Sequence, residues 1–375
     1  MAKEGKEGRV RVGVLFGGRS GEHEVSLVSA RSVMGASSPD RYGIVPIGIT
    51  REGLWRTPAE PGPPEPECAF GDASVEVALW CAQGFRGLVR LSDRPDGRPT
   101  TWSRIPLDIV FPLLHGTFGE DGTVQGLIEM VGLPYVGSGV LGSAVGMDKG
   151  VMKRLFAAAG LPQVRWCTLT ARRWAAERVV VMKELQEALG YPCFVKPANL
   201  GSSVGISKVH VHEALAPAID LAARYDRKVI VEEGIPAREI ECSVLGNEEP
   251  EASVAGEVIP CKEFYDYEAK YLLDGSQLLI PAPLDSPTMR EVQAIALRAF
   301  HAVDAAGLAR VDFFVHKETG RVYLNEINTM PGFTDISMYP KLWEASGVPY
   351  TALIDRLISL GFERHAEQAK LHRSR

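Results

Sequence analysis

Short hydrophobic runs alternate with helical patterns of polar and apolar positions through the first third of the chain. The run Arg9–Phe16 predicts a strand that ends at a glycine pair, and residues 24–33 predict a helix entered through a turn rich in Gly and Ser. The proline-rich stretch 58–67 predicts an irregular surface insertion. Further strands are predicted at 44–49 and 105–114. Strands that alternate with a helix favour a small α/β domain over residues 1–143.

Two further units follow this domain. A helical pattern over residues 148–160 ends at a Gly-Leu-Pro sequence, which combines a typical helix C-cap with a following proline. The remaining strands are predicted at 193–196, 206–210, 229–232, 240–245, 310–315 and 322–327, and the remaining helices at 288–306 and 350–360. This order predicts a mixed central unit over residues 144–234 and an α+β unit over residues 235–375.

Composition narrows the class of protein. The 375 residues are 45% hydrophobic, with 41 Lys and Arg against 47 Asp and Glu, which is typical of a folded protein and does not favour nucleic-acid or membrane binding. Residues 130–147 are uncharged but contain five Gly and one Pro, so we expect loops around a short strand there. No signal sequence is expected, and the six Cys lack CxxC spacing, so we expect reduced thiols and a cytoplasmic location.

The densest set of polar side chains flanks a KETG turn. Folded as a hairpin, the two strands place Asp312 opposite Glu326 to within about one residue of register. Because side chains alternate along a strand, Asn328 shares a face with Glu326, and Arg310 shares one with Asp312. Two carboxylates and an amide oxygen are ligands that suit Mg²⁺. The alternative is an exposed hairpin with scattered charges, which the inward-facing apolar alternation disfavours.

A second candidate is Lys196 followed by the Gly- and Ser-rich loop 199–205. Such a loop offers backbone N–H and hydroxyl donors to a phosphate, and the lysine adds a positive charge. Taken alone, the loop is equally compatible with an ordinary mobile hairpin. Its sequence is not the GxxxxGK[ST] pattern, so a P-loop is not predicted.

Three other segments leave alternatives open. Glu24, near the start of the first predicted helix, is either an anchor for a substrate ammonium or a surface residue. His115, in HGTFGEDGT, is either structural or catalytic. Residues 137–142 match GxGxxG, but the preceding strand is short and no acidic residue follows about 20 positions on, so a dinucleotide-dependent oxidoreductase is disfavoured.

In order, the motifs GEHEVS, HGTFGEDGT, GLPYVGSGVLGSAVGMDK, VKPANLGSSVGIS, VEEGIPAREIE, FYDYEAKY, RVDFF and NEINTMPGFT resemble the D-alanine–D-alanine ligase family of the ATP-grasp superfamily, over about residues 10–362. The resemblance implies an α/β and α+β fold of three domains with a Rossmann-like N-terminal domain. It also implies an enzyme that joins two D-alanines through an acyl phosphate for peptidoglycan synthesis. The implied cofactors are ATP as co-substrate and two Mg²⁺ ions, with Mn²⁺ as an alternative. The implied assembly is a homodimer.

The resemblance also implies roles for individual residues. The nucleotide contacts would come from Lys149, Lys196, Ser203, Glu232, Glu233, Ile235, Glu239, Phe264, Lys270 and Asn325. The metal ligands would be Asp312, Glu326 and Asn328. The substrate and catalytic groups would be Glu24, His115, Ser202, Tyr271, Arg310, Gly332 and Ser337. Among these, Glu24 would hold the ammonium of the first D-alanine with Ser202 and Tyr271, Arg310 and the Gly332 N–H would stabilise the oxyanion, and Ser337 would bind the second carboxylate.

Two departures from the family's pattern bear on specificity. Gly234 stands where many relatives carry a large residue, so we expect weaker stacking on adenine. Tyr271 resembles the dipeptide-forming branch, which favours an amine as the second substrate. A D-alanine–D-serine or D-alanine–D-lactate ligase is the alternative, and a non-catalytic nucleotide-binding regulator is a more distant one.

Overall fold

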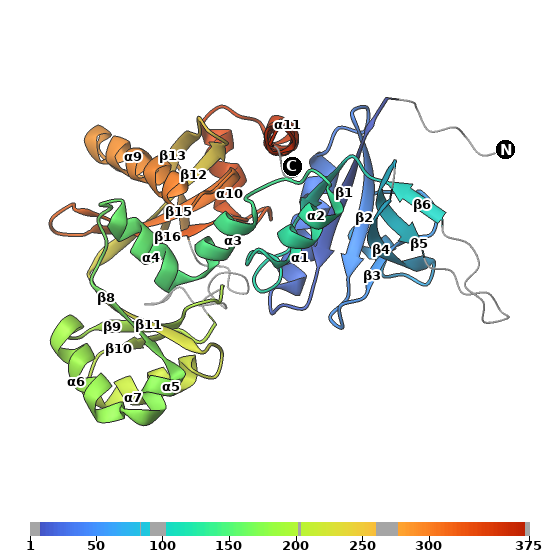
Figure 1. The fold of residues 1–375 in the computed structure, drawn as a ribbon. Helices are drawn as coiled ribbons and strands as arrows, with labels where there is room; N and C mark the ends of the chain where they lie inside the picture. Colours follow the sequence, from blue (N-terminus) through green and yellow to red (C-terminus); the bar gives the residue numbers. More distant parts are fainter. Residues whose placement is uncertain (1–7, 83, 91–102, 202–203, 260–276, 372–375) are drawn as a thin grey trace, which may run out of the picture.

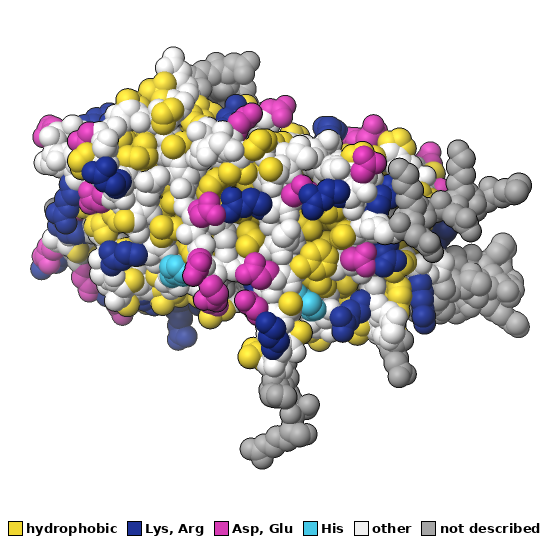
Figure 2. Space-filling model, turned by 90° about the horizontal axis from the view of Figure 1, so that it is seen from above, with side chains coloured by type: hydrophobic (Ala, Val, Ile, Leu, Met, Phe, Trp, Pro, Cys, Tyr) yellow, Lys and Arg dark blue, Asp and Glu magenta, His cyan; other side chains and the backbone are white. Residues whose placement is uncertain are grey.

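The computed structural model describes residues 8–82, 84–90, 103–201, 204–259 and 277–371, which form three β-sheets with helices around them (Figure 1). Within these ranges, no helix is both long enough and apolar enough to cross a membrane. On the face that Figure 2 shows, acidic and basic side chains are interspersed over the surface. This even distribution agrees with the small net charge of the sequence.

The N-terminal sheet has seven strands in the order β6-β5-β4-β3-β2-β1-β7. Their bounds are Val10–Gly17 (β1), Tyr42–Ile49 (β2), Trp55–Pro58 (β3), Ser74–Ala82 (β4), Phe85–Arg90 (β5), Ser103–Pro106 (β6) and Ile109–Pro112 (β7). Strand β1 runs parallel to β2 and β7, and the other pairs are antiparallel. Strand β1 lies between β2 and β7 and buries Val14 and Leu15 in separate hydrophobic clusters.

Helices cover this sheet and complete its loops. They are α1 (His23–Ala36), the short 3₁₀ helix η1 (Pro66–Ala69), α2 (Thr123–Val131) and α3 (Val140–Met147). Three predictions were wrong here: β3 to β6 were not expected, residues 105–114 divide between two strands, and residues 130–147 contain helix α3. Helix α3 was not predicted because its glycines are typical of loops. Gly142 and Gly146 instead allow close packing of the helix, since an added Cβ would press against Asp304 or Thr329.

The central sheet has four antiparallel strands in the order β10-β9-β11-β8. They are β8 (Trp166–Thr170), β9 (Cys193–Pro197), β10 (Ser207–Val209) and β11 (Lys228–Glu233), and the strands predicted in this region are confirmed. Helices α5 (Ala171–Ala176), α6 (Arg178–Leu189) and α7 (His212–Ala222) lie together below this sheet in Figure 1 and share a hydrophobic cluster with it. The opposite face of the sheet is therefore left for the site.

The C-terminal sheet has five strands in the order β14-β13-β12-β15-β16. They are β12 (Ala237–Gly246), β13 (Glu251–Ile259), β14 (Gln277–Leu279), β15 (Gly307–His316) and β16 (Val322–Asn328), with helices α9 (Ser286–Ala302), α10 (Met338–Ala345) and α11 (Tyr350–Ala369). The β15–β16 hairpin pairs Asp312 with Glu326, so the predicted register is confirmed. Helix α9 ends earlier than predicted, before a turn in which Asp304 has φ +57°, and α11 continues beyond the predicted end at residue 360.

Two helices join these sheets. Helix α11 lies between the C-terminal and N-terminal parts in Figure 1, and its Tyr350 hydroxyl is 2.9 Å from the Ser32 hydroxyl of α1. Helix α4 (Lys149–Ala158) lies between the central and C-terminal sheets. Its N-cap residue, Asp148, forms an ion pair with Lys228 of β11, and its Lys153 donates to the Asn325 carbonyl of β16. The space among the three parts is where the polar residues gather.

Candidate functional site

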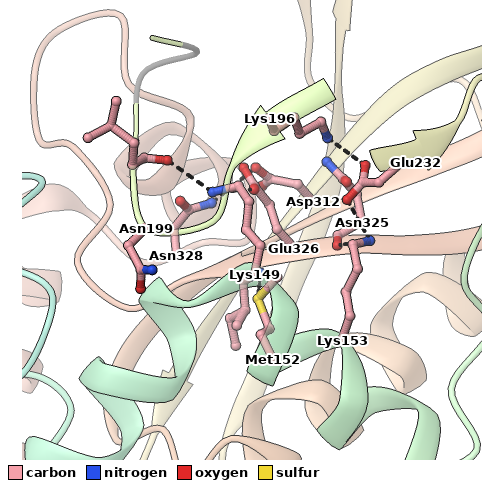
Figure 3. Close-up of polar contacts among 12 residues, drawn as sticks. Lys149, Met152, Lys153, Lys196, Asn199, Glu232, Asp312, Asn325, Glu326 and Asn328 are labelled. Carbon is pink, nitrogen blue, oxygen red and sulfur yellow. Dashed lines mark hydrogen bonds and ion pairs between the residues drawn. The ribbon is translucent and has the colours of Figure 1, made fainter. Parts of the chain in front are cut away.

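An acidic pair on the β15–β16 hairpin forms the centre of the site (Figure 3). Arg310 of β15 holds Asp312 with two hydrogen bonds of 2.7 Å, and Arg310 Nε also lies 3.0 Å from Glu241 Oε2 on β12. Burial works against the positive charge of Arg310, but the carboxylates of Asp312 and Glu241 outweigh it and raise its pKa well above the ordinary value. Arg310 is therefore a permanent cation within the site.

The acidic residues offer oxygen ligands of the kind that Mg²⁺ prefers. Asp312 and Glu326 face each other across the hairpin, and Asn328 Nδ2 donates to Asp312 Oδ2 at 3.0 Å. Among the described residues, no group of three or more His, Cys, Asp and Glu side chains is placed to hold a metal ion, so the ligand set of two carboxylates and one amide stays a prediction. Mg²⁺ usually completes its ligands with water and phosphate oxygens, and this donor set fits such an ion.

Lys149 reaches the acidic pair from the first turn of α4. Its Nζ lies 3.3 Å from Glu326 Oε2 and donates to the Leu200 carbonyl at 3.1 Å. The helix begins there because Asp148 caps it, accepting from the Val151 N–H at 3.0 Å. Lys149 thus links the start of the 199–205 loop to the acidic pair, so a phosphate bound there would meet the lysine and the loop together.

Three charged side chains form a buried cluster at one side of the site (Figure 3). Lys196 of β9 donates to Glu232 Oε2 of β11 at 2.6 Å, and Lys153 Nζ of α4 lies 3.2 Å from Glu232 Oε1. Burial alone would raise the pKa of Glu232, but the two lysine charges outweigh it and lower that pKa below its ordinary value. The cluster therefore contains an ionised carboxylate inside the protein.

Glu22, the residue just before α1, lies towards this centre, and Glu24 in the first turn of α1 does not. Glu24 is 68% exposed and accepts from Arg51 Nη2 at 2.6 Å on the surface, so its prediction as a substrate anchor is not supported by the geometry. Glu22 is half-buried, and a Cβ added at Gly116 or Gly201 would lie 2.7 or 2.8 Å from its Oε2. The two glutamates project differently because residues two apart lie on different faces of a helix.

His115 and Glu120 lie beside Glu22 at the end of the N-terminal sheet. His115 is buried, its Nε2 is 2.9 Å from the Ser29 hydroxyl, and burial lowers its pKa. Glu120 accepts from the Gly116 N–H at 2.7 Å, and burial together with the nearby charge of Glu22 raises its pKa to about 8. The HGTFGEDGT segment thus contributes a neutral histidine and a glutamate that holds a proton at neutral pH.

The loop after β16 supplies the remaining described substrate candidates. The Ser337 hydroxyl accepts from the Thr334 N–H at 3.0 Å and lies 2.8 Å from the Thr334 hydroxyl. A Cβ added at Gly332 would lie 2.7 Å from Ser337 Oγ, so Gly332 and the Ser337 hydroxyl are close neighbours. The loop follows Asn328 directly, which keeps Gly332 and Ser337 near the acidic pair.

The other predicted nucleotide residues lie on β11, β12 and β16 and, for Ile235, in the link between β11 and β12. Ile235 and Glu239 are half-buried, and the Asn325 side chain has a buried Oδ1 without a hydrogen-bond partner among the described residues. The Glu233 carboxylate instead pairs with Arg165 at 2.7 Å, which leaves its backbone as the part able to reach a nucleotide. The predictions that fall outside the described residues are those at Ser202, Ser203, Phe264, Lys270 and Tyr271.

Sequence reasoning missed Glu22, Glu120 and Lys153. The first two lie in motifs that were recognised, GEHEVS and HGTFGEDGT, so the signal was present but was assigned to a neighbouring residue. Lys153 follows Lys149 by four residues in a pattern typical of an exposed helix face, and nothing in that pattern indicates burial.

Comparisons with known proteins match almost the whole chain. Residues 11–138 match the family model described as "D-ala D-ala ligase N-terminus", and residues 155–359 match "D-ala D-ala ligase C-terminus". A D-alanine–D-alanine ligase of Thermoanaerobacter sp. (strain X514) is 51% identical, covering 96% of this chain and 98% of that protein. One of Geobacillus thermodenitrificans is also 51% identical, covering 96% and 97%.

Solved structures agree with these matches. The D-alanine–D-alanine ligase from Coxiella burnetii superposes with a TM-score of 0.82 at 37% identity, covering 97% of both chains. The VanG D-Ala:D-Ser ligase from Enterococcus faecalis superposes with a TM-score of 0.83 at 36% identity, covering 94% of this chain and 99% of that one.

Proposed function

Because this chain belongs to the D-alanine–D-alanine ligase family, we propose that the polar groups between its three sheets are the active site of such a ligase. The enzyme uses ATP to join two D-alanines into the dipeptide needed for peptidoglycan synthesis, and it has the ATP-grasp fold. The sequence-based predictions of the family, fold and activity are thereby confirmed. The proposals below concern the residues, the metal ions and the order of the chemistry.

The first step activates a carboxylate. A carboxylate reacts slowly with an amine until one of its oxygens becomes a good leaving group, so the first D-alanine takes the γ-phosphoryl group of ATP to give an acyl phosphate. Lys149 and Lys196 would contact the phosphates, and Asp312, Glu326 and Asn328 would hold two Mg²⁺ ions, or Mn²⁺. Bound metal ions would neutralise charge on the transferring phosphoryl group.

The first D-alanine needs a partner for its ammonium. The family resemblance assigned this role to Glu24, but the structure leaves Glu24 on the surface, so we assign it to Glu22 of the same motif. Glu22 adjoins Gly116 and Gly201, and glycine at both positions leaves room for the Glu22 carboxylate beside the start of the 199–205 loop. Ser202 and Tyr271 remain predicted partners from the family resemblance.

The second step forms the peptide bond. The amine of the second D-alanine attacks the carbonyl carbon of the acyl phosphate and loses a proton, and the tetrahedral intermediate then breaks its C–O bond to release inorganic phosphate. The negative charge that develops on the tetrahedral oxygen needs donors fixed in advance. Arg310, a buried permanent cation, and the Gly332 N–H would supply them, while Ser337 would bind the second carboxylate and His115 would line the substrate side. Closure of the 199–205 loop would exclude water, which would otherwise hydrolyse the acyl phosphate.

The observation that carries these residue assignments is the β15–β16 register. It brings Asp312 and Glu326 together beside Arg310, with Lys149 3.3 Å from Glu326. Carboxylates for metal ions beside fixed cations suit phosphoryl transfer, because in that reaction the protein mainly positions groups and stabilises charge.

Phosphate release tests the function directly. The full-length protein is incubated with Mg-ATP and D-alanine, beside parallel reactions with L-alanine, D-serine and D-lactate, and the products are identified by mass. Release that depends on D-alanine, with D-alanyl-D-alanine as product, supports the proposal. A mixed product with D-serine would instead place the chain with ligases such as the VanG relative, and release without D-alanine would refute the substrate assignment.

Two further features follow from the family and the substrate. We infer a homodimer from the family resemblance, which light scattering of the purified protein tests. Because the reaction consumes ATP, we infer that it takes place in the cytoplasm, which fractionation of the producing cells tests.

A further inference from the structure

Lys153 is a buried lysine that no proposed step of the reaction uses. It is 1% exposed, and lysine is almost never fully buried unless it is paired. Its Nζ donates to the Asn325 carbonyl at 3.0 Å and lies 3.2 Å from Glu232 Oε1 (Figure 3). Burial of an ammonium group is unfavourable, so a lysine at this position needs a specific partner.

The two oxygens of Glu232 have different surroundings. Oε2 accepts a hydrogen bond from Lys196 at 2.6 Å. Oε1 is buried beside Lys153, yet it has no hydrogen-bond partner among the described residues. A buried carboxylate oxygen without a donor is costly, and native proteins usually supply one. Oε1 thus has the Lys153 ammonium at 3.2 Å but no donor in hydrogen-bond geometry among the described residues, so it keeps capacity to accept a hydrogen bond.

The two lysines are not equivalent partners for Glu232. Lys196 is proposed to contact the ATP phosphates, which would draw its charge away from Glu232 when the nucleotide binds. Lys153 lies on the other side of Glu232 and is held by the Asn325 carbonyl, so its charge stays beside the carboxylate. Lys153 is thus the cation that remains with Glu232 in the occupied site.

We propose that Lys153 is a positioning residue that keeps Glu232 as a hydrogen-bond acceptor for the adenine amino group, and so sets the preference for adenine over 6-oxopurines. This inference rests on the proposed contact between Glu232 and the adenine edge. The amino group of adenine donates a hydrogen bond to a carboxylate, whereas the 6-oxo group of hypoxanthine is an acceptor and is repelled by it. Without Lys153, the buried carboxylate would take up a proton and could then donate to a 6-oxo group.

The test compares ATP with ITP in the full-length enzyme and in Lys153→Met. The readout is the ratio of kcat/KM for ATP to kcat/KM for ITP, measured by phosphate release with saturating D-alanine. We expect this ratio to fall at least about tenfold in Lys153→Met, mostly through a higher KM for ATP, while kcat at saturating ATP changes only a few-fold. Lys183→Met, an exposed lysine of α6, is the matched control and should keep the wild-type ratio.

A double-mutant cycle separates positioning from a merely structural role. If Lys153 acts through Glu232, then Glu232→Gln alone lowers the ratio, and adding Lys153→Met to it lowers the ratio no further. An unchanged ratio in folded Lys153→Met, or independent effects of the two substitutions, would overturn the proposal. Circular dichroism checks folding. If Lys153→Met does not fold, Glu232→Gln is measured alone. A wild-type ratio in that variant would overturn the proposal, because Glu232 would then not set the purine preference through which Lys153 is proposed to act.

Failure of the proposed function gives a different result. A wild-type protein that releases no phosphate with D-alanine refutes the ligase assignment but leaves the purine preference measurable. Competition of ATP and ITP against a fluorescent ATP analogue then reports the same ratio as relative affinities. A preference for ATP that Lys153→Met removes supports the inference in either case, and a preference that it leaves intact overturns it.

Discussion

Glu22 and Glu24 make a matched pair, because one site motif contains both and the structure separates them. Glu22 is half-buried beside Gly116 and Gly201, whereas Glu24 is 68% exposed and paired with Arg51. We expect Glu22→Gln to impair the ligase severely and Glu24→Gln to leave it almost unchanged. Glutamine keeps the size of the side chain and removes only its charge.

The expected magnitudes follow from the surroundings. Removing one partner of a desolvated charge pair costs about 3–5 kcal/mol, which corresponds to a loss of roughly two to four orders of magnitude in kcat/KM for D-alanine. An exposed pair contributes about 0–1 kcal/mol, so Glu24→Gln should change kcat/KM less than about fivefold.

The assay is D-alanine-dependent phosphate release with ATP saturating and D-alanine varied. Thermal unfolding of both variants serves as the folding control. Equal losses in the two variants, or a larger loss in Glu24→Gln, would refute the assignment of the ammonium anchor to Glu22. A loss in Glu22→Gln that is independent of D-alanine concentration would show that the residue acts elsewhere in the reaction.

Three further predictions concern charge and stability. Glu326→Gln should abolish turnover and weaken the Mg²⁺ dependence of ATP binding while unfolding stays cooperative; wild-type activity would exclude a metal role. Because the pKa of Glu120 is raised from 4.5 to about 8, the folded protein keeps a proton that the unfolded chain loses, so the unfolding free energy should fall as pH rises through this range. Glu120→Gln should flatten that slope in urea titrations, and an unchanged slope would refute the buried acid. Asp148→Ala removes both the α4 cap and the ion pair with Lys228, so it should lower the free energy of unfolding by about 2–4 kcal/mol. The control Asp285→Ala removes only the cap of α9 and should lower it by about 1 kcal/mol. Equal losses in urea titrations would show that the ion pair does not contribute.

The predictable parts of this protein were those fixed by local periodicity. The KETG turn and the alternation of its flanking strands determine the register, so the opposition of Asp312 and Glu326 could be predicted before any three-dimensional information. The strands β4 to β6 were missed because they pair antiparallel near the sheet edge, and their runs of mixed residues resemble loops.

The less predictable parts depend on packing between distant segments. Which glutamate of GEHEVS faces the site depends on the exact helix start, and a shift of two residues exchanges a surface position for an inward one. Lys153 is buried because α4 lies against both β11 and β16, two strands far from it in sequence. No pattern within α4 itself records those neighbours.

Helix α4 has a mechanical consequence for how the site opens. Near its start, Asp148 pairs with Lys228 of the central sheet and Lys149 with Glu326 of the C-terminal sheet. One turn later, Lys153 contacts both sheets again, through Glu232 and the Asn325 carbonyl. Because Glu232 belongs to β11, a rotation of the central sheet about this helix would carry both the 199–205 loop and Glu232 away from the C-terminal sheet. The phosphate end and the purine end of the site would then open together, so one helix couples the two ends during nucleotide exchange.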